Sequence, residues 1–222
     1  MRIALIGGTG DIGEGLALRW AYDTDHEIVV GSRDPDRARA KADEYETELD
    51  SRGVDAEVSG FENAMAADRA DVVVLSVPAY HLVDTVEHIA DRLDEGDVLV
   101  TPAVGMQRDD DGLHYNRPSA GSVAALCADA APDGVPVVGA FHNLAAGRLA
   151  NLDADLDVDT LVFGDDDDAK DIVSMLADEI VGLRPLDVGG LANAPEVESL
   201  TPLLINLAMN NDDLHDVGVK FH

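Results

Sequence analysis

The sequence predicts an α/β protein in which a doubly wound, mainly parallel sheet carries helices on both faces. Three observations predict this fold: strand-like and helix-like segments alternate along the chain, residues 71–77 (DVVVLSV) form an almost unbroken β-branched run, and a glycine-rich turn follows the first strand. Such alternation is typical of parallel sheets, and an apolar run fits a strand buried on both faces. We expect this sheet within residues 1–150 and a small C-terminal α/β domain at residues 151–222.

The first five elements follow from short apolar runs and turn residues. Residues 2–6 (RIALI) predict a short buried strand, and residues 16–20 (LALRW) continue the glycine turn as a helix. Residues 26–31 predict the second strand. A helix is expected at residues 35–49, because its first residue is a proline, which suits the first turn of a helix. Residues 54–58 predict a weak third strand.

The middle of the chain repeats the same alternation. The β-branched run at residues 71–77 predicts a strand that the next proline stops. An amphipathic helix is expected at residues 79–93. Residues 97–101 and 136–141 predict two further strands, separated by a loop around residues 109–112 and a helix near residues 119–131.

The last third of the chain supplies fewer elements. We expect a strand at residues 160–164 and a helix at residues 169–181. Apolar spacing from residue 197 to residue 209 predicts one long, mostly buried helix. This part is too small for an independent substrate domain, so we expect it to fold against the carboxyl edge of the sheet and to wall the crevice there.

The glycine-rich turn is the first functional motif. Gly8, Gly10 and Gly13 fit the pattern G-x-G-x-x-G between a strand and a helix, the context that dinucleotide-binding Rossmann domains require. Such glycines permit the tight turn, the close approach of a pyrophosphate and the close packing of helix on strand. The alternative is an ordinary glycine-rich turn.

The end of the second strand indicates which dinucleotide binds. No carboxylate stands where NAD enzymes use one to bind the adenosine ribose; the sequence there is Gly-Ser-Arg, ending in Ser32 and Arg33. Ser32 can donate a hydrogen bond to a 2′-phosphate, Arg33 can bind it with two, and Arg37 lies one turn further on. This pattern favours NADP. The alternative is that both arginines only pair with Asp34 and Asp36.

Composition excludes several classes of protein. The 45 acidic and 15 basic residues give a formal charge of −30, which argues against a nucleic-acid partner. The charge resembles that of proteins from salt-loving archaea, in which salt screens the self-repulsion; an acidic surface for a basic protein partner is the alternative. One cysteine, Cys127, permits no internal disulfide, and no Cys and His cluster has metal-ligand spacing. Without a signal-peptide core or membrane span, a cytoplasmic protein is expected.

Three segments at strand ends, residues 77–81, 101–107 and 141–148, occupy the expected crevice. None of them offers a nucleophile with a base beside it, and none contains a lysine. Reductases of ketones or imines need a proton donor such as Tyr or Lys, whereas hydride transfer between two redox cofactors mainly needs two rings held face to face. His142 could orient or protonate a bound heterocycle, and a purely structural histidine is the alternative.

The chain resembles the F420-dependent NADP oxidoreductases along nearly its whole length. The resemblance rests on GGTGDIGEGLALR, HEIVVGSRD, SVPAYH, AFHNLAAGRLANL, FGDDDDAK, GLRPLDVGGLAN and VESLTPLLINLA. The glycine turn is common to many reductases, whereas the last two segments are absent from ordinary ketoreductases and imine reductases. Family membership implies a homodimer that moves a hydride between NADPH and the deazaflavin coenzyme F420, with a Rossmann domain for NADP and a small C-terminal domain closing over the deazaflavin.

The same resemblance implies a set of site residues. The NADP site would include Gly8, Gly13, Ser32, Arg33 and Arg37, and the pyrophosphate would contact Thr9, Gly10, Asp11 and Ile12. The nicotinamide side would be lined by Ala79, Val104, Met106, Gln107 and Ala146. The deazaflavin would be surrounded by His142, Leu144, Ser199 and Val217. Asp11 and Ala79 depart from the family pattern, which has a neutral residue and a bulky aromatic there.

Two other functions stay open at this point. The first is an NADP-dependent reductase of a small carbonyl or imine, against which the lack of a lysine and of a nucleophile beside a base in the three crevice segments counts. The second is a non-catalytic NADP sensor whose C-terminal part reports cofactor binding to a partner. Titration with a deazaflavin distinguishes both from a reductase that uses coenzyme F420.

Overall fold

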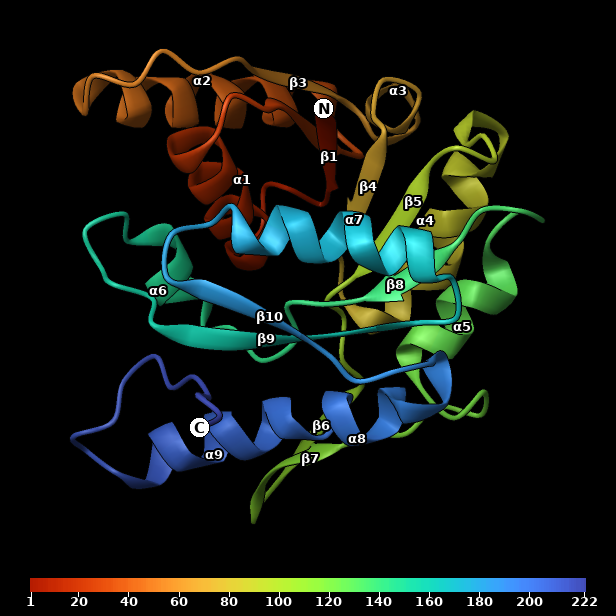
Figure 1. Cartoon of the computed structure of the whole chain (residues 1–222), viewed down its shortest axis with the longest axis vertical. Coiled ribbons are helices and arrows are strands. Elements are labelled where there is room, and N and C mark those ends of the chain that lie inside the picture. Colours follow the sequence, from red (N-terminus) through yellow and green to blue (C-terminus); the bar gives the residue numbers. More distant parts are fainter.

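A single mixed sheet organises the molecule, and the computed structural model describes all residues from 1 to 222. Eight strands form this sheet in the order β10-β9-β8-β5-β4-β1-β2-β3, with helices on both faces (Figure 1). All neighbouring pairs are parallel except β8 and β9. The predicted α/β fold with a doubly wound, mainly parallel sheet is therefore confirmed.

The helices and strands alternate through most of the chain. The strands of the main sheet are β1 (Arg2–Ile6), β2 (Glu27–Ser32), β3 (Val58–Glu62), β4 (Val72–Leu75), β5 (Val98–Thr101), β8 (Val137–Gly139), β9 (Val158–Gly164) and β10 (Leu183–Asp187). A separate hairpin contains β6 (Met106–Asp109) and β7 (Gly112–Tyr115). The helices are α1 (Asp11–Asp23), α2 (Pro35–Ser51), α3 (Asn63–Ala67), α4 (Leu82–Ile89), α5 (Val123–Ala130), α6 (Ala146–Ala150), α7 (Asp167–Asp178), α8 (Ala194–Glu198) and α9 (Leu200–Asn210). Short 3-10 turns cover Ala79–His81, Ala90–Arg92 and Leu191–Asn193.

The strand order places the crevice. From β3 to β8 it reads β3-β2-β1-β4-β5-β8, so the direction in which successive strands are added reverses between β1 and β4. In open α/β sheets, ligands bind outside the carboxyl ends of the strands at such a reversal. The glycine turn after β1 and the segment after β4 therefore border the same crevice.

Alternation along β1 divides the core between the two faces of the sheet. Ile3 and Leu5 belong to the cluster under α1, α2, α6 and α7, whereas Ala4 and Ile6 belong to the cluster under α3, α4 and α5. Successive side chains of a strand point to opposite faces, so the apolar run from Ile3 to Ile6 can fill both cores. Because each face is covered, β1 is held rigidly, and so is the glycine turn that follows it.

The last third of the chain continues this sheet. β9 pairs antiparallel with β8, β10 pairs parallel with β9, and α7 covers both. The strands of residues 151–222 thus add to the sheet of residues 1–150, and α8 and α9 lie below its edge with the β6–β7 hairpin (Figure 1). Whether residues 151–222 behave as a second domain stays a prediction.

Several element boundaries differ from the sequence-based expectations. The third strand covers Val58–Glu62 and not residues 54–58. Gly53, at φ +79°, ends α2, and the chain then crosses to the sheet before pairing begins. The strand includes Gly60, where any side chain would overlap the backbone of Ala38 in α2, so only glycine fits there. Because glycine is unfavourable inside strands, it makes the strand harder to predict from the sequence.

The C-terminal helix also differs from the expectation. One long, mostly buried helix was expected at residues 197–209, but a break near Ser199 separates α8 from α9. In α9 only Pro202 and Leu204 are buried, and Leu203, Leu207 and Met209 are at least 40% exposed. The apolar residues of α9 therefore do not all serve the core of this chain.

None of the helices combines the length and apolar character that crossing a membrane requires.

Candidate functional site

The glycine turn after β1 is shaped by contacts that only glycine allows. Gly7 has φ +79°, and its N–H donates to the carbonyl of Gly31 in β2 at 3.0 Å. A Cβ on Gly13 would lie 2.6 Å from Cα of Gly8, and a Cβ on Gly8 would lie 2.7 Å from the carbonyl of Leu5. Gly8 and Gly13 thus let α1 pack closely against β1, which leaves the first turn of α1 facing the crevice.

A polar cavity of about 630 Å³ lies along the carboxyl ends of β1, β2 and β4. It brings together Thr9, Gly10, Ser32, Arg33 and Arg37, which the sequence assigns to the pyrophosphate and the 2′-phosphate. Val77, Pro78 and His81 also line it, as expected for the segment at residues 77–81. The remaining lining residues were not assigned individually: Gly7, Glu62, Asn63, Ser76, Asp84, Thr85 and His88. We call it the nucleotide cavity.

The two arginines of this cavity are not neutralised by carboxylates. Asp34 caps α2, accepting from the N–H groups of Asp36 and Arg37, and the Asp36 carboxylate pairs with Arg39. Arg33 makes no ion pair, and Arg37 only approaches the carbonyl of Thr9, at 3.4 Å. The alternative that both arginines merely pair with Asp34 and Asp36 does not occur. Their charges remain available to an anion in the cavity.

The nucleotide cavity is also lined by acidic and imidazole groups. Glu62 accepts from His88 Nε2 at 2.9 Å and from the N–H of Ala64 at 2.9 Å. Although burial acts to raise it, the pKa of Glu62 is lowered, because His88 and the amide of Ala64 stabilise the carboxylate. The protein thus holds this carboxylate by hydrogen bonds, whereas Arg33 and Arg37 pair with no carboxylate.

A second, largely apolar cavity of about 900 Å³ adjoins the first turn of α1. Gly10 lines the nucleotide cavity and Asp11 and Ile12 line this one, so the two cavities meet at the start of α1. Besides Asp11 and Ile12, the expected residues Val104, Met106, His142, Leu144, Ala146 and Val217 line this second cavity. Pro102, Phe141, Asn143 and Ala145 line it as well, within the segments 101–107 and 141–148 that were expected at the crevice. The lining residues that were not expected are Thr201, Leu204, Ile205, Ala208, Met209, Leu214, His215 and Asp216. We call it the apolar cavity.

A strained turn after β8 forms one wall of the apolar cavity. Phe141 has φ +66°, an unfavourable conformation for an aromatic residue. Three contacts hold the turn: the N–H of Phe141 donates to Thr160 Oγ1, the hydroxyl of Thr201 donates to the carbonyl of His142, and Asn143 Nδ2 donates to the carbonyl of Asp159. Strain that surrounding contacts enforce is common at functional sites.

His142, within this turn, is buried without hydrogen-bond partners. The residue is 3% exposed, neither ring nitrogen has a partner, and the ring stacks on Phe163 with 5.2 Å between centroids. Burial lowers the pKa of the imidazole to about 3, so the ring is neutral near pH 7. A buried imidazole with two unmet nitrogens destabilises the chain, and the ring must turn before either nitrogen can reach a ligand.

Two polar anchors join the β6–β7 hairpin to the C-terminal helices. The buried carboxylate of Glu198 accepts from the N–H groups of Val123 and Ala124, both at 3.0 Å, and from the hydroxyl of Tyr115 at 2.8 Å. Burial raises the pKa of Glu198, and these donors oppose the rise. Asn206 of α9 binds both backbone groups of Leu113. The hairpin and α9 thus wall the apolar cavity as one unit.

Five expected site residues lie outside both cavity walls. Gly8 and Gly13 pack the turn, as described above, and Ala79 follows Pro78 in a 3-10 turn. Gln107 is exposed on β6, and the Ser199 hydroxyl donates to the carbonyl of Glu196. Of the motif VESLTP, it is Thr201 that lines the apolar cavity. No group of three or more His, Cys, Asp or Glu residues is placed to hold a metal ion.

Comparison with known proteins gives a consistent result. Residues 2–105 match the family model described as NADP oxidoreductase coenzyme F420-dependent. The chain is 38% identical over 209 residues to the F420-dependent NADP reductase of Methanocaldococcus jannaschii, which covers 93% of this chain and 92% of the relative. It is 39% identical over 223 residues to the enzyme of the same description from Methanothermobacter marburgensis, with 99% and 97% covered.

A solved structure supports the same fold over the full length. A protein from Arthrobacter sp. FB24 superposes with a TM-score of 0.80 and 23% identity, over 100% of this chain and 99% of that one. At this identity the likeness concerns the fold alone. The sequence relatives decide the family: the chain belongs to the F420-dependent NADP reductases.

Proposed function

We propose that this protein transfers a hydride between coenzyme F420 and NADP. The observation that carries the proposal is the pair of cavities that meet at the first turn of α1: one is polar with two unpaired arginines, and the other is wide and mainly apolar. A phosphate-bearing nucleotide fits the first, and a flat heterocycle fits the second. The curated relatives, described as F420-dependent NADP reductases, point to the same pair of ligands.

The protein's contribution is to bind, orient and exclude water. When bound, the two coenzymes supply the chemistry, a hydride that passes between nicotinamide and deazaflavin rings. Amides at the start of α1 would face the pyrophosphate, and Arg33 and Arg37 would hold the 2′-phosphate. Residues of β8–α6, the hairpin and α9 would keep the rings face to face in a dry cavity.

Each assigned residue has a proposed place in this arrangement. The pyrophosphate turn would consist of Gly8, Thr9, Gly10, Asp11, Ile12 and Gly13, and the 2′-phosphate site of Ser32, Arg33 and Arg37. The nicotinamide side would be lined by Ala79, Val104, Met106, Gln107 and Ala146. The deazaflavin side would be lined by His142, Leu144, Ser199 and Val217. The neutral ring of His142 supports a positioning function more than that of an obligatory acid.

An absorbance assay tests the proposal against its alternatives. NADPH mixed with oxidised coenzyme F420 and the protein should bleach the visible band of the deazaflavin. A reductase of carbonyls or imines would instead consume NADPH with such substrates and leave coenzyme F420 unchanged. A non-catalytic sensor would bind NADP and turn over neither.

We also propose that the protein is a homodimer that pairs through α9. The support is the exposed apolar pair Leu203 and Leu207, which lie one turn apart on α9 and outside the apolar cavity that Met209 lines. Light scattering should give about twice the mass of the 222-residue chain. Glu substitutions at Leu203 and Leu207, which lie outside both cavity walls, should give the monomer mass; an unchanged mass would place the interface elsewhere.

The proposed setting is a salt-rich cytoplasm. The charge of −30 is spread over the whole chain, and the single cysteine, Cys127, is buried, with a pKa that burial raises to about 12. The thiol therefore stays protonated and unreactive. Both features suit a reducing interior with enough salt to screen the acidic surface.

A further inference from the structure

We infer that Asn63 binds the adenosine half of NADP. Asn63 is the first residue of α3, directly after β3, and it lines the nucleotide cavity while being only 4% exposed. Its carboxamide oxygen is buried without a hydrogen-bond partner. This inference rests on the proposed use of NADP and adds a contact for which the family resemblance gave no residue.

The surroundings of Asn63 are built to hold this side chain. Gly31, in β2, faces the carboxamide: a Cβ there would lie 2.9 Å from Cδ1 of Ile6 and 3.1 Å from the carboxamide oxygen of Asn63. The oxygen therefore rests against the sheet. The same residue lines the nucleotide cavity with Ser32 and the segment after β4, so a turn of the carboxamide would present the oxygen to a nucleotide there.

The order of the strand ends identifies which part of the nucleotide Asn63 would meet. β1, β2 and β3 are neighbours in the sheet, so their carboxyl ends form one row. The glycine turn after β1 faces the pyrophosphate, and Ser32 and Arg33 after β2 face the 2′-phosphate. The next position in the row, after β3, is that of Asn63. The adenosine ribose and adenine are the groups within reach there.

The chemistry of an unmet carboxamide oxygen requires a hydrogen-bond donor. Adenosine in NADP offers two, the 3′-hydroxyl of the ribose and the 6-amino group of adenine. An unpartnered buried amide destabilises the free protein, and a ligand donor that meets it recovers this loss only in the complex. Such a residue raises affinity at the expense of the stability of the unliganded fold.

The test compares Asn63→Ala and Asn63→Leu with a matched control, Asn143→Ala. Asn143 is equally buried, at 2% exposed, but its carboxamide donates to the carbonyl of Asp159 and accepts from the N–H of Leu161. We expect the Asn63 variants to bind NADP about tenfold more weakly, the typical effect of a lost hydrogen bond to a buried group. Their melting temperatures without ligand should be unchanged or higher, whereas that of Asn143→Ala should fall.

A nucleotide analogue separates the two possible donors. In nicotinamide hypoxanthine dinucleotide phosphate the 6-amino group is replaced by oxygen. If the amino group is the donor, the wild-type chain already binds the analogue weakly and Asn63→Ala adds nothing further. If the 3′-hydroxyl is the donor, the substitution weakens both nucleotides equally. Either pattern supports a contact with adenosine and assigns its atom.

Two results would overturn the inference. If both Asn63 variants bind NADP within twofold of the wild-type affinity, Asn63 does not contact the nucleotide. A melting temperature that falls as in Asn143→Ala, with equal losses of NADP and coenzyme F420 affinity, would make Asn63 a structural residue. A wild-type chain that binds NADP but reduces no coenzyme F420 contradicts the proposed reaction and leaves the binding test of Asn63 intact.

Discussion

At the scale of single residues, the site is marked by polar groups that the protein itself leaves unmatched. Arg33 and Arg37 have no carboxylate partner in a chain with three acidic residues for each basic one, and Asn63 and His142 have buried polar atoms without hydrogen bonds. A folded protein satisfies nearly all such groups. Their concentration along two adjoining cavities is the strongest local sign of where ligands bind.

Arg33→Ala should remove the preference for NADP. The guanidinium can bind a phosphate with two charge-assisted hydrogen bonds, and this contact is absent with NAD. The Michaelis constant for NADPH should rise about tenfold or more, while that for NADH stays nearly constant. The matched control is Arg39→Ala, since Arg39 pairs with Asp36 outside the cavity. An equal weakening of both nucleotides would make Arg33 structural.

His142→Phe should change how stability depends on pH. The unfolded chain protonates this imidazole near pH 6.5, whereas burial keeps it neutral in the fold down to about pH 3. The lowered pKa therefore leaves stability unaffected above about pH 6.5 and destabilises the fold as the pH falls from there to about pH 3, by about 1.4 kcal/mol per unit. Urea unfolding at pH 7 and pH 5, at one salt concentration, should show a shallower pH dependence in the variant. Equal slopes would contradict a buried neutral ring.

The same substitution should lower turnover only modestly. Phe can stack on Phe163 as His142 does, and it leaves no unmet nitrogen, so the unfolding free energy at pH 7 should not fall. If His142 positions the deazaflavin, turnover should fall much less than if it supplied an essential proton. A loss of about four orders of magnitude, the upper range of general acid catalysis, would show that it is the acid.

Sequence reasoning located part of this site and missed part for physical reasons. Ser32, Arg33 and His142 follow the ends of strands, so their position in the chain alone brought them to the crevice, whereas Thr9 came from the family resemblance. Asn63 follows a strand that the sequence placed four residues too early. Its importance depends on a missing hydrogen bond, which only the packed structure reveals.

At the scale of elements, the sequence predicted strands buried on both faces and missed those that depend on distant partners. β1, β4 and β5 are apolar except for Arg2 and Thr101 at their ends, and they were located within two residues at each end. β6, β7 and β10 carry polar or charged residues, and tertiary contacts determine their pairing, so no local sequence pattern predicts them. The expected loop at residues 109–112 is in fact the turn of the β6–β7 hairpin.

Glu198→Gln should loosen the hairpin and weaken deazaflavin binding selectively. One carboxylate oxygen would become an amide that faces the N–H of Val123 or Ala124, so a buried donor loses its acceptor. We expect a loss of about 1–3 kcal/mol in unfolding free energy. The Michaelis constant for coenzyme F420 should rise and that for NADPH should stay constant. Glu196→Gln, at an exposed residue, is the control. If both variants change the unfolding free energy and the Michaelis constants equally, Glu198 does not anchor the hairpin.

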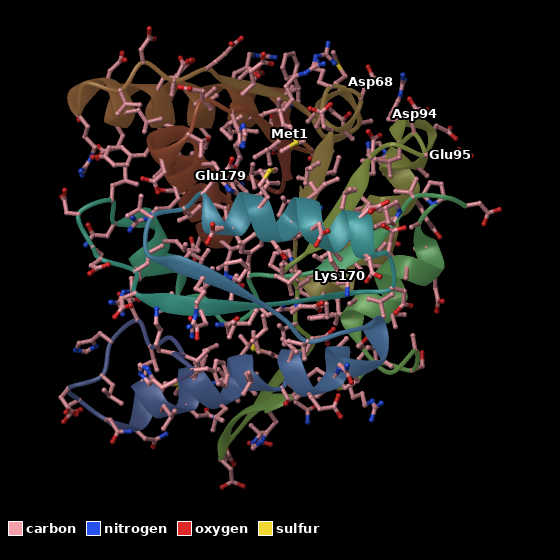
Figure 2. The ribbon with its side chains drawn as sticks, in the orientation of Figure 1. Met1, Asp68, Asp94, Glu95, Lys170 and Glu179 are labelled. Atoms are coloured by element: carbon pink, nitrogen blue, oxygen red, sulfur yellow. The ribbon has the colours of Figure 1, made fainter.

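At the scale of the whole molecule, charge is the dominant property. Acidic side chains cover the periphery, as Asp68, Asp94 and Glu95 do near α3 and α4 (Figure 2). Most basic side chains are already paired: Asp68 contacts both Arg69 and Arg92, and Lys170 contacts Asp167 and Asp187 at 3.0 and 3.1 Å. With 45 acids and 15 bases, pairing cannot neutralise the surface. The excess must be screened by salt or by a partner.

Stability should therefore rise with salt. The screening length falls from about 10 Å at 0.1 M to about 3 Å at 1 M, which removes most repulsion between surface carboxylates. We expect the melting temperature to rise from about 0.05 to 3 M KCl, a range that spans this screening. The Michaelis constant for NADPH should fall or stay flat, since screening also lets an anionic nucleotide approach an anionic protein. Highest stability and activity at the lowest salt would favour a basic protein partner for this surface.

The central claim is that one chain holds NADPH and coenzyme F420 with their rings in contact, so that a hydride passes directly between them. The most direct measurement uses NADPH carrying deuterium on the nicotinamide carbon that donates the hydride, with oxidised coenzyme F420 in ordinary water. Mass spectrometry should find the deuterium in the reduced deazaflavin when the label is on the transferred face. Reduced coenzyme F420 without deuterium from either labelled face, or no reduction at all, would contradict the account.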